Sequence, residues 1–433
     1  MVSRAKVRPS GVGLLAVGSA LFVLPFLSPS AAAGQALVRQ ADPPQVMTAE
    51  RWARDIDVLG EELPKRHKNL FFKVSEADFR KEVESLKAAL PSLGPDETLV
   101  RLLRLVASVG DSHTALGYRP QRGLPLMLYW FKDGIYVLNT TAEHKDILYG
   151  KVTALGGRPI AEVTAALASV IPHENGSQVR NQVPRFLADT AVLKGLGLIP
   201  SPDSASLTVL TDSGKILTVE MAPIAFSSKP AWLVESTDDS AVPLYLRKRN
   251  VFYWFEVLPG ERALYFKYNS CQEIPGRPFA GFVRELFAAV DAGPVDRIVV
   301  DLRHNGGGNS AVFGPFLEEF KKRPALLEKG RLAVIVGRRT FSSAVLNALD
   351  LKKAAPVVFV GEPTGGKPNH YGELQTLRLP ESGLTATYST KFFQVVDGDP
   401  DSIFPDIAVE PTFADHRARL DPALAAALGR LRL

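Results

Sequence analysis

Three short segments of this 433-residue chain carry side chains that could perform nucleophilic chemistry. Ser342 lies in the segment GRRTFSSA at 337–344, and Lys367 closes the segment GEPTGGK at 361–367. His113 lies far upstream, in VGDSHT at 109–114. A serine hydroxyl is a weak nucleophile until a base within hydrogen-bond reach takes its proton, and a neutral lysine or histidine can be that base. The three segments predict a serine hydrolase, provided that the fold brings them together.

A glycine-rich segment, DLRHNGGG at 301–308, supplies a second component of such chemistry. Consecutive glycines let the backbone adopt unusual φ angles and approach a ligand with free N–H groups. The N–H groups of Gly307 or Gly308, together with that of Ser343, are therefore candidates for an oxyanion hole. A flexible connection is the alternative, whereas a phosphate-binding loop is disfavoured because no Lys-Ser/Thr pair follows. His304 and Asn305 are expected to shape this loop rather than to react.

Each reactive residue also has a simpler interpretation when it is taken alone. A serine at a helix start is most often an N-cap, and a lysine in a loop is most often a solvated surface charge. The segment around Ser342 is not a G-x-S-x-G motif. It nevertheless lies between an apolar run and a helical pattern, and a strand-to-helix turn of this kind exposes a hydroxyl beside free N–H groups.

The C-terminal half of the chain has the pattern of an α/β fold. Dense apolar runs at 263–268, 297–302, 332–336 and 357–360 alternate with helical patterns at 279–290, 311–320 and 343–352. Buried strands that alternate with helices predict a parallel sheet with both faces covered. Ligands bind outside the carboxyl ends of such strands. The segments at 301–308, 337–344 and 361–367 each follow a strand, so they are expected at this edge.

The N-terminal half has two further patterns. Residues 48–108 repeat apolar side chains at helical spacing, with Thr48 as a cap and Pro91 and Pro95 as breaks, which predicts a small helical unit. From Leu124 the pattern changes to strands at 126–131, 134–138, 152–157 and 207–210, with one helix at 160–170. This mainly β region ends near Pro223.

In this order, the segments resemble the carboxyl-terminal processing (tail-specific) serine peptidases. That family has a D-L-R-x-N-x-G-G strand end, a serine at a strand-to-helix turn and a G-E-P-T-x-G-K loop, with a Ser-to-Lys separation like that from 342 to 367. The segment at 109–114 is similar to its D-x-H-T segment, and FPDIAV at 404–409 is similar to its closing P-D-I-x-V strand. LGGRPI at 155–160 resembles an I-N-G-x-P-I stretch in the family's inserted PDZ-like module.

The resemblance implies an α/β fold with a crotonase-like (ClpP-like) βα spiral core, an N-terminal helical unit and a PDZ-like β insert. The expected divisions are a signal peptide at 1–33, a linker and helical unit at 34–116, the insert at 117–225 and the peptidase core at 226–433. It further implies cleavage of proteins or peptides, near the C-terminus, by Ser342. A non-catalytic peptide- or lipid-binding protein on the same scaffold is the alternative, because fold alone never fixes chemistry.

The base stays open between two residues. Lysine-dependent members of the family carry a glutamate three residues after the nucleophile, where this chain has Val345. The tricorn-like branch instead takes a histidine from a Ser-His pair, which Ser112-His113 matches. Lys367 would need desolvation to become neutral, whereas a histidine has an ordinary pKa of about 6.5. Asp399 is a candidate to orient His113. The insert also has two interpretations: a module whose loop Gly123–Leu126 holds a free C-terminal carboxylate, or a shortened cap.

Composition excludes several other classes of protein. Cys271 is the only cysteine, so no intramolecular disulfide or multi-cysteine zinc site can form, and burial is expected for it. Neither the residues nor the resemblance implies a cofactor. Removing the three basic residues of the leader reduces the formal charge from +5 to +2, and the other charges are interleaved, so we expect no nucleic-acid partner.

The N-terminus has the pattern of an export signal. A positive start, an apolar stretch at 11–27 broken by Pro25 and the run Ala31-Ala32-Ala33 predict cleavage before Gly34. An uncleaved anchor is the alternative, but the apolar run is short for a stable span. The sequence therefore predicts a secreted or periplasmic protein with no membrane span after cleavage.

Overall fold

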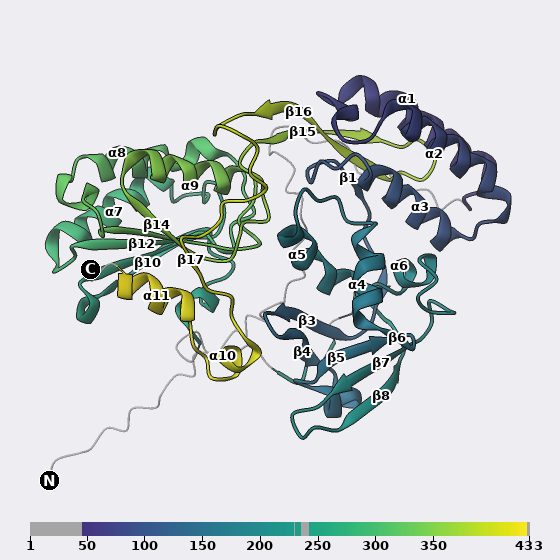
Figure 1. Ribbon diagram of the computed structural model, residues 1–433, viewed down its shortest axis with the longest axis horizontal. Coiled ribbons are helices and arrows are strands. Elements are labelled where there is room, and N and C mark those ends of the chain that lie inside the picture. The colour runs from purple at the N-terminus through teal and green to yellow at the C-terminus, as the bar shows by residue number, and fades with distance from the viewer. Residues whose placement is uncertain (1–45, 229, 235–241, 431–433) are drawn as a thin grey trace, which may run out of the picture. The chain divides into compact units, whose positions relative to one another are not determined.

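A computed structural model describes residues 46–228, 230–234 and 242–430 (Figure 1). The expected leader at 1–33 lies outside these residues. Within the described part of the chain, no helix is both long and apolar enough to cross a membrane. All the elements below belong to one compact unit that begins at Val46.

The helical unit predicted at 48–108 is confirmed. It consists of α1 (Ala49–Arg66), α2 (Glu76–Ala89) and α3 (Pro95–Ala107). Thr48 caps α1, because its hydroxyl accepts a hydrogen bond from the N–H of Arg51 at 3.4 Å. Pro95 occupies the first turn of α3, where a missing N–H costs nothing.

The β region forms an antiparallel sheet in the order β3-β4-β5-β7-β8. Its strands are β3 (Leu126–Phe131), β4 (Gly134–Thr140), β5 (Lys151–Leu155), β7 (Ala205–Leu210) and β8 (Ile216–Met221), with short β6 (Arg158–Pro159) beside β5. The predicted helix is α4 (Ile160–Ala168). The expectation of a single helix is wrong, because α5 (Gly176–Phe186) and α6 (Thr190–Gly195) follow it. Helix α5 carries Val179, Val183 and Phe186 at helical spacing, so its apolar period was readable from the sequence despite Pro184.

The C-terminal half forms a six-stranded sheet in the order β10-β11-β12-β13-β14-β17, parallel except for β10. The strands are β10 (Tyr253–Leu258), β11 (Ala263–Tyr268), β12 (Arg297–Asp301), β13 (Leu332–Val336), β14 (Val357–Gly361) and β17 (Ile407–Ala408). One face is covered by α7 (Phe279–Ala292), α8 (Gly314–Lys321) and α9 (Ser343–Ala354) (Figure 1). The other face packs against α11 (Pro422–Arg430). The predicted parallel sheet with two covered faces is confirmed.

A third sheet connects distant parts of the chain. Its order is β1-β16-β15, all antiparallel: β1 (Ala115–Gly117), β16 (Thr385–Phe393) and β15 (His370–Arg378). The remaining elements are the two-stranded pair β2 (Arg122–Gly123) and β9 (Ile224–Ala225), and helix α10 (Phe413–Arg417). Strand β1 directly follows the DSHT segment and β15 follows Lys367, so this sheet brings the N-terminal motif to the core.

Candidate active site

The loops after β12, β13 and β14 meet at the carboxyl edge of the parallel sheet. The N–H of Phe341 donates to the carbonyl of Asn305 at 3.0 Å, and the N–H of Gly366 donates to the carbonyl of Thr340 at 3.0 Å. Glycine is required at this junction, since a Cβ on Gly365 would lie 2.1 Å from the carbonyl oxygen of Arg338. The predicted convergence of the three segments is therefore present in the fold.

Ser342 lies at the start of α9 in a backbone conformation that is unusual for a residue with a side chain. Its φ is 52° and its ψ is −127°. A helix N-cap ordinarily has an extended backbone and a side chain that accepts a hydrogen bond from the first turn. Within the described chain the Ser342 side chain makes no such capping bond. The simple N-cap interpretation is therefore wrong, and the hydroxyl is left for another role.

The glycine loop lies directly against this serine. Gly307 has a φ of 101°, and a Cβ placed on it would lie 2.8 Å from the Cβ of Ser342. The neighbouring Gly308 has a φ of 134°, and its carbonyl accepts a hydrogen bond from the Ser343 hydroxyl at 2.7 Å. Both glycines are needed, because a larger residue would be strained or would collide with the serine.

The candidate oxyanion donors differ in availability. The N–H of Gly307 already donates to the side-chain oxygen of Asn305 at 2.9 Å. Ser343 is the first residue of α9, and the N–H of such a residue has no intrahelical acceptor. Asn305 thus shapes the glycine loop as expected, and the N–H groups of Gly308 and Ser343 are the better placed pair.

His113 is buried next to the nucleophile segment. Its ring stacks on Phe341, the residue before Ser342, at a centroid distance of 4.4 Å, and on His370 at 5.4 Å. Neither ring nitrogen has a hydrogen-bond partner among the described residues. Burial lowers the pKa of His113 to about 4, against the opposing effect of the Asp111 carboxylate. The ring is therefore neutral at pH 7 and has a free lone pair.

Asp111 holds the DSHT turn in place, a role that the sequence did not reveal. Its carboxylate accepts hydrogen bonds from the hydroxyls of Thr114 at 2.6 Å and Ser389 at 2.7 Å, and lies 3.0 Å from Nε2 of His67. Burial raises the pKa of Asp111, but these hydrogen bonds and the nearby His113 outweigh it and keep the pKa below its usual range. Its place in the quoted D-x-H-T motif was the available signal.

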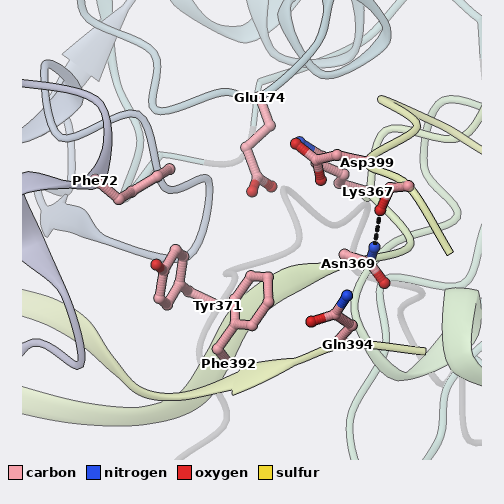
Figure 2. Close-up of a pocket in the computed structure, with 9 residues that line it drawn as sticks. Phe72, Glu174, Lys367, Asn369, Tyr371, Phe392, Gln394 and Asp399 are labelled. Atoms are coloured by element: carbon pink, nitrogen blue, oxygen red, sulfur yellow. Dashed lines mark hydrogen bonds and ion pairs between the residues drawn. The ribbon is translucent and has the colours of Figure 1, made fainter. Parts of the chain in front are cut away.

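Lys367, the other candidate base, is paired with acidic side chains. Its ammonium lies 2.6 Å from a carboxylate oxygen of Asp399 and 3.9 Å from Asp401. It lines a cavity that includes neither Ser342 nor His113 among its described lining residues (Figure 2). Asp399 is thus paired with Lys367, and no hydrogen bond joins it to His113 in the part of the chain that the structure describes.

Glu174 is a further polar residue beside this site that the sequence analysis missed. It lies between α4 and α5 and accepts a hydrogen bond from the Ser112 hydroxyl at 2.5 Å. Burial raises its pKa to about 7. No sequence signal pointed to Glu174, because its position depends on how the β region packs against the DSHT turn.

Two other expected features can be checked directly. Cys271 is buried, as predicted, with its sulfur near Asn305 and Asn347. In the suggested carboxylate loop, the N–H of Leu124 donates to Ala188 and that of Leu126 donates to Leu124, so these donors are occupied. Among the described residues, no group of three or more His, Cys, Asp or Glu side chains could hold a metal ion.

Comparison with known proteins identifies the fold. No protein-family model matches the chain, and no curated protein matches it in sequence. Mature CPAF complexed with lactacystin superposes with a TM-score of 0.63 at 13% identity, over 89% of this chain and 98% of that chain. Mature CPAF alone superposes with a TM-score of 0.62 at 13% identity, over 88% of this chain and 96% of that chain. The photosystem II D1 C-terminal processing protease gives 0.38 at 12% identity, over 83% and 93%.

This chain therefore has a mixed α/β fold of the CPAF type along nearly all of its described length. The CPAF superpositions support an α/β fold of the kind that the predicted resemblance implied.

Proposed function

We propose that this protein is a serine peptidase with Ser342 as its nucleophile. The observation that carries the proposal is the strained backbone of Ser342, with its φ of 52°, at a strand-to-helix turn against Gly307. Positive φ in a residue with a side chain costs about 1–3 kcal/mol and persists where surrounding structure enforces it, commonly at active sites. The peptidase neighbours support the same class of reaction.

We further propose that the N–H groups of Gly308 and Ser343 bind the oxyanion. Attack by the Ser342 oxygen on a peptide carbonyl places negative charge on the carbonyl oxygen. The start of α9 favours that charge through its free N–H groups and its dipole. One such donor is typically worth about 10²–10³ in rate. The hydrogen bond from the Ser343 side chain to Gly308 fixes the two donors relative to each other.

Of the two candidate bases, we favour His113. It is neutral, it packs against the residue before Ser342, and neither ring nitrogen has a hydrogen-bond partner among the described residues, with Nδ1 lying 3.8 Å from the Asp111 carboxylate. Lys367 is bound to Asp399, and an ammonium held by a carboxylate has no lone pair to accept a proton. In this assignment His113 takes the Ser342 proton as the acyl-enzyme forms and returns it to the leaving amine.

The proposed peptidase function also assigns a role to each sheet. The six-stranded sheet with its helices is the crotonase-like core, and the sheet from β3 to β8 is the PDZ-like insert. Strand β3 is an edge of that sheet, and α5 packs beside it. A peptide that binds along this edge, next to α5, would extend the sheet by one strand. We propose that the substrate is read from its free C-terminus. If amidating the C-terminus of a good peptide substrate leaves kcat/KM unchanged, the proposal that the free C-terminus is recognised is wrong. The serine peptidase proposal is not affected by that result.

Export completes the proposal. The apolar stretch and Ala31-Ala32-Ala33 direct the chain to the periplasm or medium, with a mature start near Gly34. N-terminal sequencing that finds Met1 retained on membrane-bound protein would overturn it.

Hydrolysis of an unstructured protein substrate tests the peptidase function. We expect measurable turnover by the wild-type chain and a loss of at least about 10³-fold in Ser342→Ala, because the nucleophile is removed. Ser343→Ala is the matched comparison: it keeps the nucleophile and its own backbone N–H and loses only the hydrogen bond to Gly308, so its loss of turnover should be far smaller than that of Ser342→Ala. Peptide binding without hydrolysis by the wild-type protein would instead favour the non-catalytic binding protein.

A further inference from the structure

A cavity of about 240 Å³ lies beside the candidate active site (Figure 2). This is smaller than the roughly 300–1,000 Å³ of pockets that enclose whole small-molecule ligands, and it suits one side chain. It adjoins the site through two residues: Lys367 follows Gly366, which lies against Ser342, and Glu174 binds the hydroxyl of Ser112, the neighbour of His113. Its described lining includes Phe72, Tyr371 and Phe392, and the charged residues Glu174, Lys367 and Asp399.

One wall of this cavity is aromatic. The ring of Tyr371 lies 4.6 Å from that of Phe72 and 4.8 Å from that of Phe392, measured between centroids. Phe72 and Phe392 are both 38% exposed, although large apolar side chains are usually buried. Exposed rings around a cavity offer faces on which a flat or cationic group can stack.

The opposite wall carries charge, and its charges are unevenly paired. The ammonium of Lys367 is already bound by Asp399 at 2.6 Å. The carboxylate of Glu174 points into the cavity (Figure 2), and the Ser112 hydroxyl is its one hydrogen-bond donor among the described residues. Among the described residues Glu174 therefore has no salt-bridge partner, although Lys367 and Lys73 lie close enough to influence its charge.

The raised pKa of Glu174 agrees with the lack of a salt-bridge partner. Burial raises its pKa to about 7; the nearby Asp111 adds to the shift, while the Ser112 hydrogen bond, Lys367 and Lys73 reduce it. The raised pKa leaves the Glu174 carboxylate only partly ionised near neutral pH. A cation placed in the cavity would favour the ionised form and release the proton.

We propose that this cavity binds a basic side chain of the peptide substrate, with Glu174 pairing its charge and the rings of Phe72, Tyr371 and Phe392 packing on it. The guanidinium of arginine suits both walls, because it is planar and can bind a carboxylate while it stacks on a ring. A neutral side chain would leave Glu174 without a partner. The inference rests on the proposed peptidase function, since the occupant is a residue of its substrate.

Binding to the Ser342→Ala protein tests this without requiring hydrolysis. The probes are six hexa-alanine peptides with a free C-terminus, each with one arginine at a different position, and six matched peptides with citrulline, its neutral isostere. We expect arginine to bind at least about tenfold more tightly than citrulline at one position, as for loss of a hydrogen bond to a charged group. Binding of that arginine peptide at pH 7 should also release protons.

Two additional substitutions assign the effect. Glu174→Gln should reduce the arginine preference to within about threefold and abolish proton release, while Glu220→Gln, the same change at an exposed position on β8, should keep both. Phe392→Leu keeps the charge and removes one ring, and should weaken the arginine peptide about two- to fivefold relative to citrulline. Melting temperatures verify that each variant is folded.

The proposal is overturned if arginine and citrulline peptides bind equally at all six positions, or if no arginine peptide binds at millimolar concentration. It is also overturned if Glu174→Gln retains the preference. None of these results affects the assignment of Ser342, which is tested by its own chemistry.

Discussion

At the scale of single residues, the site depends on backbone conformations that are unfavourable in isolation. Ser342 and Gly307 both have positive φ, and their Cβ positions would approach within 2.8 Å. Hydrogen bonds between the three loops, including Phe341 to Asn305 and Gly366 to Thr340, offset this strain. The hydroxyl of Ser342 is thereby held at the edge of the sheet rather than used as a helix cap.

Replacement of Gly307 tests this arrangement. We expect Gly307→Ala to lower kcat/KM by more than about 10²-fold, because the new methyl group must displace Ser342. Gly157→Ala is the matched control: Gly157 also has a positive φ, of 75°, but a Cβ there meets nothing within 4 Å. The control should lose some stability and keep its activity. Equal activity in the two variants would contradict the close packing of the glycine loop on Ser342.

The base can be identified by comparing His113→Ala with Lys367→Ala. We expect His113→Ala to reduce kcat/KM by about 10²–10⁴-fold and Lys367→Ala by less than about tenfold. A base acts only when neutral, so activity falls as pH drops below its pKa. With His113 near 4, kcat/KM of the wild-type enzyme should rise through about pH 4 and stay level above pH 6.

A profile that keeps rising into alkaline pH, together with a large loss in Lys367→Ala, would assign the lysine instead. Folding of both variants must be verified first, because His113 also packs between two rings.

At the scale of elements, the C-terminal helix is attached to the glycine loop by buried charges. Arg303, in the glycine loop, contacts Asp301 at 2.9 Å and binds both oxygens of Asp421 at 2.8 and 2.9 Å. Asp421 in turn accepts a hydrogen bond from the first turn of α11. The nearby charges of Arg303 and Lys267 outweigh burial and lower the pKa of Asp301 to about 2.

Removal of Arg303 should therefore be costly. We expect Arg303→Ala to lower the free energy of unfolding by about 3–5 kcal/mol, because the buried Asp421 loses its ion-pair partner and Asp301 keeps only Lys267. Arg262→Ala removes an exposed pair with Asp296 and should cost less than about 1 kcal/mol. Urea denaturation measures both. A small loss in Arg303→Ala would mean that α11 is held by apolar contacts alone.

Elements that bury continuous apolar runs were predictable from the sequence. Elements whose position depends on packing against distant parts of the chain were not. The runs at 297–302 and 332–336 became β12 and β13 because parallel strands are buried on both faces. The β15–β16 hairpin was missed because half of β15 is exposed, including Glu373 and Leu374. The rule that ligands bind at the ends of parallel strands predicted where Ser342 lies. Glu174 lies in the connection from α4 to α5, and no local pattern shows that this connection packs against the DSHT turn.

At the scale of the whole molecule, His113 and Glu174 have opposite effects on the pH dependence of stability. A histidine with a lowered pKa binds its proton more weakly in the folded state, so stability is lost as pH falls from about 6.5 towards 4. Glu174, with a raised pKa of about 7, has the opposite sign: its contribution is present at low pH and is lost as pH rises through 7. Because the two contributions overlap between about pH 4 and pH 7, a variant is needed to isolate each group.

His113→Phe isolates the histidine. Relative to the wild type, this variant should gain roughly 2–3 kcal/mol of unfolding free energy between pH 7 and pH 4.5, because it has no ring to protonate. Chemical denaturation at the two pH values measures the difference. An identical difference at both pH values would show that His113 titrates normally.

The central claim, that Ser342 is an activated nucleophile, is tested most directly by covalent labelling. A fluorophosphonate reacts with an activated serine hydroxyl, and peptide mass spectrometry then locates the adduct. We predict a single adduct on Ser342 that is absent in Ser342→Ala, present in Ser343→Ala and strongly slowed in His113→Ala. An adduct on Ser343, or no adduct on the folded wild-type protein at neutral pH, would contradict the account.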